Sequence, residues 1–161
     1  MMAPPLTIPT PQGASTLLAG LVGRATPAKK IKLDWTREKG WLSFSEFRHP
    51  EGEIAALFVA DLPFCSWSGA ALALLPSGLA QDGIKAGKLE PALQDNFAEV
   101  ANVLTATFRE YGERVILGHT YYGSATLLPP ELRSIVGAPR RLDLEVTITG
   151  YGVGRCGLLL A

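Results

Sequence analysis

The sequence has few of the residues that build metal sites and disulfide scaffolds. It contains two cysteines and two histidines among 161 residues. Cys65 and Cys156 stand far apart, and neither has a histidine or cysteine at metal-ligand spacing, so the sequence predicts neither a zinc site nor a disulfide framework. Because free cysteine behaves as a small core residue, we expect two buried, reduced thiols.

An excess of charge and a long apolar run are also missing. Fifteen basic residues balance fifteen acidic ones, which excludes the electrostatic footprint of a nucleic-acid-binding or polybasic membrane-surface protein. No run approaches the roughly 18 apolar residues of a membrane-spanning helix, and residues 1–15 lack the positive charge of a signal peptide. We expect a cytoplasmic protein that binds neither nucleic acid nor membrane.

The length and the proline distribution indicate one domain with a loose beginning. A chain of 161 residues is long enough for one core and too short for two ordinary domains. Residues 1–12 carry four prolines, which disfavour a helix there. We therefore expect a flexible, proline-rich segment at residues 1–12 and a single domain at residues 13–161.

Hydrophobic periodicity and turn residues predict the secondary structure. Helices are expected at residues 15–23, 76–86, 89–111 and 130–136. Strands are expected at residues 30–35, 41–47, 54–62, 70–75, 114–122, 142–150 and 157–160, the first two forming a hairpin. Strands paired through short turns, with helices inserted between hairpins, predict an α+β two-layer domain: a mostly antiparallel sheet with helices packed on it.

The segment of residues 89–111 has the strongest helical pattern. Its apolar residues recur every three or four positions and form one stripe that faces the core: Leu89, Leu93, Phe97, Val100, Leu104 and Phe108. Asp95, Glu99 and Asn102 lie within about 60° of one another on the opposite side, because a helix turns about 100° per residue. They therefore share an exposed face that a partner can reach.

These three residues suit a particular chemistry, but they also suit an ordinary solvated surface. A carboxylate accepts hydrogen bonds from a basic side chain, and a carboxamide one turn away can both donate to and accept from a water molecule. Every amphipathic helix nevertheless has a polar face, and Asp, Glu and Asn are common there. The pattern alone leaves both interpretations open.

The pattern Asp95-x-x-x-Glu99-x-x-Asn102, followed later by a proline, resembles the signature of the CheC, CheX and FliY family of chemotaxis phosphatases. Residues 69–76 resemble the glycine-led strand and turn that precede the signature helix. The resemblance covers about residues 54–160 and implies a CheC-like fold. Because Glu-x-x-Asn occurs once, it implies a single-site, CheX-like member, and CheX-like proteins are often dimers, so a homodimer is compatible with the sequence.

The resemblance also implies a function and a role for each residue. The protein would accelerate hydrolysis of the phosphoaspartate on a response-regulator receiver domain. Asn102 would orient the attacking water, Glu99 would contact a lysine of the receiver, and Asp95 would support them. The receiver would supply Mg²⁺, and the protein would need no cofactor of its own.

Two departures from the family pattern keep other functions open. Ala106 stands where family members often have glycine, and Pro129 and Pro130 follow Asn102 later than the usual signature proline. One alternative is a non-catalytic, receiver-binding or flagellar-switch-like adaptor with the same fold. Another is a small-molecule enzyme, which would require a concave apolar pocket with convergent polar groups.

The aromatic residues have a structural interpretation. Trp35, Trp41 and Trp67 fall on or beside predicted strands, where bulky rings fill a core or cover a sheet face. Tyr121 and Tyr122 are adjacent in a predicted strand, so one of them must face outward.

Overall fold

A computed structural model describes residues 6–161. Its elements, in chain order, are α1 (Pro11–Val22), β1 (Ala28–Lys30), β2 (Leu42–Arg48), β3 (Ile54–Asp61), α2 (Leu62–Leu72), α3 (Ser77–Ala86), α4 (Pro91–Leu104), the 3-10 helix η1 (Thr105–Tyr111), β4 (Ile116–Gly123), the 3-10 helix η2 (Ala125–Leu127), α5 (Pro130–Val136), β5 (Arg141–Ile148) and β6 (Gly152–Leu160). The predicted α+β class is confirmed.

The strands form one six-stranded sheet in the order β1-β5-β6-β3-β2-β4. Every neighbouring pair is antiparallel. Strands β1 and β4 form the two edges. Pairing between β2 and β4 changes register between Ser45 and Phe47, and the carboxylate of Glu46 accepts a hydrogen bond from the backbone N–H of His119 at this irregularity. The side chain thus satisfies a backbone donor that the ladder leaves unpaired.

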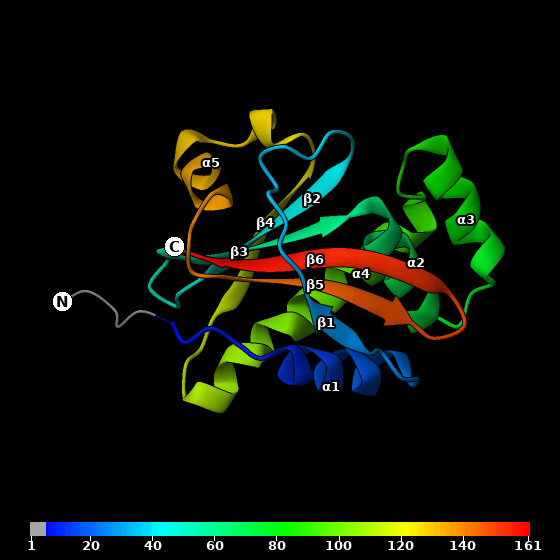
Figure 1. Ribbon diagram of the computed structural model, residues 1–161, viewed down its shortest axis with the longest axis horizontal. Helices are drawn as coiled ribbons and strands as arrows, with labels where there is room; N and C mark the ends of the chain where they lie inside the picture. The colour runs from blue at the N-terminus through cyan, green and yellow to red at the C-terminus, as the bar shows by residue number, and fades with distance from the viewer. Residues whose placement is uncertain (1–5) are drawn as a thin grey trace.

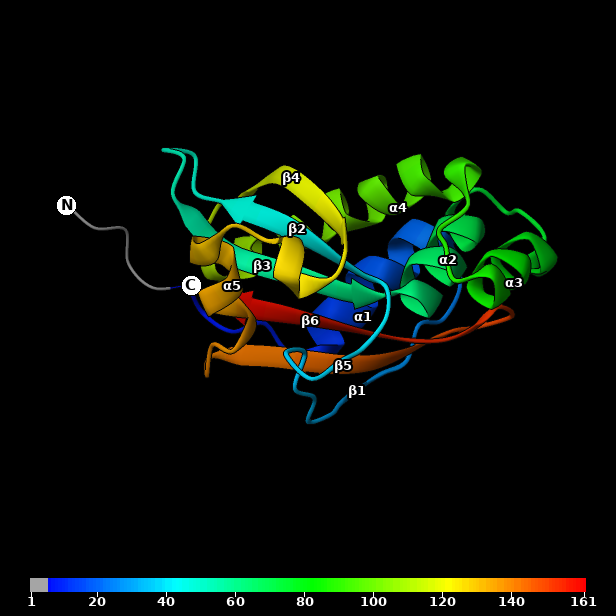
Figure 2. The same ribbon diagram turned by 90° about the horizontal axis from the view of Figure 1, so that it is seen from above.

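Helices cover the two faces of the sheet unequally. The larger core cluster lies between the sheet and helices α1, α2 and α4, whereas a smaller cluster lies between the other face and α5. Figure 1 shows α5 above the strands and α1 below them, and Figure 2 shows α5 in front of the strands when the molecule is seen from above. The sheet and the helices α1, α2 and α4 form the two predicted layers. Helix α5 covers part of the second face of the sheet, which the prediction did not include.

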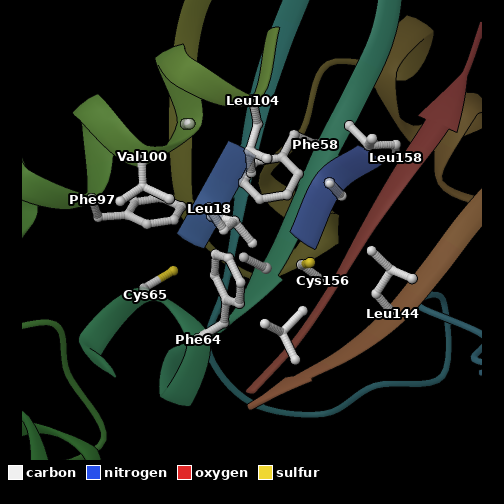
Figure 3. Packing of buried hydrophobic residues seen from close by; sticks show 14 of the residues in the cluster. Leu18, Phe58, Phe64, Cys65, Phe97, Val100, Leu104, Leu144, Cys156 and Leu158 are labelled. Carbon is white, nitrogen blue, oxygen red and sulfur yellow. The ribbon is translucent and has the colours of Figure 1, made fainter. Parts of the chain in front are cut away.

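Helix α4 packs through the predicted apolar stripe. Phe97 is buried and lies over Phe58 of β3, with ring centroids 6.3 Å apart. Figure 3 shows Phe97, Val100 and Leu104 directed from α4 into the core beside Phe58 and Phe64. The regular helix ends at Leu104 and continues as η1, and Gly112 closes it with a left-handed φ of 73°.

Helix α2 replaces a predicted strand. Residues 70–75 were predicted as a strand, and this is wrong, because residues 70–72 end α2 and residues 73–75 form the turn that follows it. Asp61 caps the helix by accepting a hydrogen bond from the N–H of Phe64 at 2.9 Å, and Pro63 lies in the first turn. The helix is buried on most sides, so it lacks the apolar period that marks a helix in a sequence.

The predicted hairpin of residues 30–35 and 41–47 is also wrong. β1 pairs with β5 at one edge of the sheet, while β2 lies between β3 and β4. The intervening chain crosses the second face, where Trp35 is fully buried and its Nε1 donates to Asp143 Oδ1 at 2.7 Å. Arg141 donates to Asp143 Oδ2 at 2.7 Å and to the carbonyl of Leu33 at 2.8 Å. These long-range contacts, rather than a local turn, determine the path.

The N-terminal helix begins earlier than predicted. Thr10 caps α1 by accepting from the N–H of Gly13 at 3.0 Å, and Pro11 occupies the first turn, where its missing N–H costs nothing. Of the predicted flexible segment, residues 1–5 lie outside the described residues, whereas Leu6 is buried and Pro11 already belongs to α1.

The prediction of two buried thiols is confirmed. Cys65 of α2 and Cys156 of β6 are free and buried. Burial raises the pKa of both thiols above the ordinary value. Both therefore remain protonated at neutral pH and act as small core residues.

The close approach of α2 and α4 provides a test of this packing. A Cβ atom at Gly69 would lie 2.9 Å from the carbonyl oxygen of Leu93, whereas one at Gly20 in α1 would meet nothing within 4 Å. We expect Gly69→Ala to lower the free energy of unfolding by about 1–3 kcal/mol through overpacking. Gly20→Ala, the matched control, should leave it unchanged or raise it by up to about 1 kcal/mol. Urea unfolding of both variants measures the difference, and equal effects would contradict the close contact.

Candidate functional site

Helix α4 presents Asp95, Glu99 and Asn102 to solvent. All three side chains are exposed, while Phe97 and Val100 on the opposite side of the same helix are fully buried. Glu99 and Asn102 are one turn apart and hence neighbours on the helix surface. The helix carries two acidic residues and no basic one between Pro91 and Leu104. The site is therefore an acidic, convex helix face with one carboxamide.

Specific contacts hold the backbone of this face in place. Asn96, next to Asp95, donates from Nδ2 to the carbonyl of Gly69 on α2 at 3.0 Å. At the other end, the hydroxyl of Thr105 donates to the carbonyl of Asn102 at 2.6 Å where α4 passes into η1. With Phe97 locked in the core between them, the helix offers its exposed groups from a rigid support.

An aromatic pair lies beside the first residue of the pattern. Trp41, just before β2, stacks on Tyr122 of β4 with ring centroids 5.6 Å apart. Burial raises the pKa of the Tyr122 hydroxyl, the nearby Cys65 and Asp95 side chains act in the same direction, and the side chain of Gln94 lowers it through a hydrogen bond. Tyr122 therefore stays protonated at neutral pH and borders the exposed face of α4.

The sequence did not indicate this neighbourhood. Alternation along the strand predicted only that one of Tyr121 and Tyr122 faces outward. In the structure Tyr121 packs with the smaller cluster near α5, and Tyr122 packs with the larger one near α4. No spacing rule relates Tyr122 to Asp95, because their relative position depends on how β4 packs against α4.

The two departures from the family pattern lie at different places. Ala106 of η1 lines a groove of about 360 Å³ together with Thr10 and residues of α1, among them Gln12 and Thr16. Pro129 and Pro130 instead begin α5, whose buried residues pack on the second face of the sheet. The prolines thus have a structural role, and the fold does not bring them to Asp95, Glu99 and Asn102.

Other hollows lie away from α4. One of about 740 Å³ is open to solvent and is lined by residues 30–34, Thr36, Gly137, Pro139, Arg141 and Asp143, at the β1 edge. None of Asp95, Glu99 and Asn102 contributes to it. Among residues 6–161, no group of three or more His, Cys, Asp or Glu side chains is arranged to hold a metal ion. No helix in the same range is long and apolar enough to cross a membrane.

Known structures share this architecture. A chain of the FliM–SpeE complex from H. pylori has a TM-score of 0.66 at 8% identity, covering 93% of this chain and 80% of that chain. Chemotaxis protein CheX from Vibrio vulnificus has a TM-score of 0.53 at 10% identity, over 93% and 95%. A CheC-like superfamily protein from Shewanella sp. PV-4 has a TM-score of 0.52 at 8% identity, over 93% of each chain. The fold is CheC-like.

The likeness is one of fold. No protein-family model and no curated protein sequence matches the chain. The CheC-like fold occurs in the chemotaxis protein CheX and in FliM alike. What the helix α4 of this chain does therefore has to be argued from its own residues.

Exposure of the site gives a prediction about stability. Asp95→Ala, Glu99→Ala and Asn102→Ala should each change the free energy of unfolding by no more than about 0.5 kcal/mol, because all three side chains are exposed. Phe97→Ala on the same helix should lower it by about 3–5 kcal/mol. Thermal and urea unfolding provide the comparison. A large loss of stability for any exposed residue would show that its side chain is part of the packing.

Proposed function

We propose that the protein is a phosphatase that accelerates hydrolysis of the phosphoaspartate of a response-regulator receiver domain. The observation that supports this most is the exposure of Glu99 and Asn102 one turn apart on the rigid helix α4 of a CheC-like fold. The sequence pattern of α4 resembles the signature of the CheC, CheX and FliY phosphatases. A convex helix face can enter the phosphorylation site of another protein, whereas it cannot enclose a small substrate.

Asn102 would act on the attacking water. An acyl phosphate is already activated, so its hydrolysis can be accelerated mainly by placing a water molecule in line with the bond that breaks. The Asn102 carboxamide has both a donor and an acceptor for that water. Thr105 holds the Asn102 carbonyl at the end of α4 and so limits the freedom of this backbone. Because the acyl phosphate is already activated, Asn102 needs neither a general base nor a nucleophile beside it.

Glu99 would fix the position of the partner. Its exposed carboxylate can accept a charge-assisted hydrogen bond from a lysine of the receiver, one turn from Asn102. Asp95, a further turn away, adds negative charge in the same direction. The receiver would bring its own Mg²⁺ to neutralise the phosphoryl oxygens. A cytoplasmic location follows from such a partner and belongs to the same proposal.

A receiver-binding adaptor without activity is the second candidate. It is favoured by the position of Pro129 and Pro130, which begin α5 on the second face of the sheet and do not reproduce the spacing of the signature proline. In an adaptor, Glu99 would still bind the receiver, and Asn102 would be an ordinary exposed residue. A phosphatase and an adaptor would both bind the receiver, so only a measurement of phosphoaspartate hydrolysis distinguishes them.

Asn102→Ala tests the catalytic role. In Mg²⁺ buffer with an acetyl-phosphate-charged receiver, the wild-type protein should accelerate phosphate release. The variant should lose about 100-fold of this acceleration or return to the rate of the receiver alone, since displacing a positioned reactant has effects of this size. Its affinity for the receiver should stay nearly unchanged. Binding by the wild-type protein without acceleration would favour the adaptor.

Glu99→Ala tests the docking role. Loss of a charge-assisted hydrogen bond should raise the Kd for the receiver about 10- to 100-fold, and activity at low receiver concentration should fall with it. Asp82→Ala, which removes an exposed carboxylate of α3, is the matched control and should change neither quantity. Titration calorimetry and phosphate release measure both. An unchanged Kd for Glu99→Ala would remove Glu99 from the interface.

A further inference from the structure

The Trp41–Tyr122 pair is an unusual feature of the surface next to Asp95. Both rings are only partly buried, although they pack against the larger core. Strand β4, which carries Tyr122, packs against α4, and the side chains of Gln94 and Asp95 on that helix affect the pKa of the Tyr122 hydroxyl. The segment just before β2 and the end of β4 thus meet in the aromatic pair, and β4 lies beside α4.

The chain preceding Trp41 is held by an ionic network rather than left free. Arg155 donates to Asp61 Oδ2 at 3.1 Å and to Glu38 Oε1 at 2.9 Å, and so ties the loop before β2 to the start of α2. Gly40, with a φ of 106°, makes the turn between Glu38 and Trp41. The indole therefore has a defined position before any partner arrives, which lowers the entropic cost of binding.

We propose that Trp41 and Tyr122, with Gln94 and Asp95, extend the docking face of α4 and bind a basic side chain of the receiver domain. This inference rests on the proposed function, because it names a further part of the same partner surface. The aromatic pair would determine how tightly the receiver binds and which receiver is chosen, and it would take no part in the chemical step.

Charge and shape support this occupant. The exposed face of α4 carries Asp95 and Glu99 and no basic residue, so a cationic partner surface complements it. A lysine or arginine can lie over an indole ring with its charge toward a neighbouring carboxylate, and so use both features of the site. Tryptophan and tyrosine are also the residues that most often dominate binding energy at protein interfaces. The pair stands at the Asp95 end of the pattern, which leaves Asn102 free for the reaction.

The test measures binding and hydrolysis separately in Trp41→Ala and Tyr122→Phe. The receiver is charged with beryllofluoride and Mg²⁺ for the Kd and with acetyl phosphate for kcat and KM. We expect Trp41→Ala to raise Kd and KM about tenfold and Tyr122→Phe to raise them less, both with unchanged kcat. Val153→Ala, an exposed apolar residue of the β5–β6 hairpin, is the control and should change none of the three quantities. Circular dichroism establishes that each variant is folded.

Tryptophan fluorescence gives an independent reading. The chain has three tryptophans. Trp35 is fully buried in the other cluster, and the ring of Trp67 packs against Gly152 of β6. The part of a receiver-dependent change in emission that is lost in the conservative variant Trp41→Phe should therefore come from Trp41, and we expect it to be the larger part. An unchanged Kd for Trp41→Ala, or a lower kcat at an unchanged Kd, would overturn the docking role. If Trp41→Ala weakens binding but the wild-type protein does not accelerate hydrolysis, the docking role stands and the phosphatase fails. A wild-type protein that binds no receiver would overturn both.

Discussion

The position of α4 depends on a close contact between the backbones of α2 and α4 at Gly69, where no side chain separates the two helices. At Gly69, α2 approaches the backbone of α4 so closely that a single Cβ atom would lie 2.9 Å from the carbonyl of Leu93. The Asn96 side chain then bonds the Gly69 carbonyl from α4. Because α2 is itself buried on most sides, α4 is carried by a helix that cannot shift without disturbing the sheet. The exposed residues on α4 owe their fixed position to this contact.

The second face of the sheet carries a buried charge network beside the apolar cluster under α5. Asp143 is almost fully buried and is satisfied by Trp35 and Arg141, and Arg141 also holds the carbonyl of Leu33. A buried carboxylate without these donors would be strongly destabilising. The network therefore obliges the chain after β1 to cross the sheet before it enters β2. After the crossing, Trp41 stacks on Tyr122 of β4.

The CheC-like fold by itself does not decide between an enzyme and a binding protein. It is found in chemotaxis protein CheX and in FliM, at identities to this chain too low to transfer a function. In this chain the difference would depend on one exposed carboxamide, Asn102, because the rest of the α4 face is equally suited to docking. Neither the core nor the position of Pro129 and Pro130 requires that carboxamide to be catalytic. An enzyme and a binding protein that differ only in the role of this carboxamide would have nearly the same packing.

Sequence patterns predicted correctly those elements whose signals are local. The apolar stripe of α4, the proline that opens α5 and the αL glycine after η1 were all readable, because helix period and capping act within a few residues. The exposure of Asp95, Glu99 and Asn102 followed from the same period. Three features became visible only in the folded molecule: residues 70–72 belong to a helix, β1 and β2 do not pair, and the strand of Tyr122 packs against α4. Each of these depends on burial from several sides or on contacts between distant segments, and neither leaves a periodic pattern in the sequence.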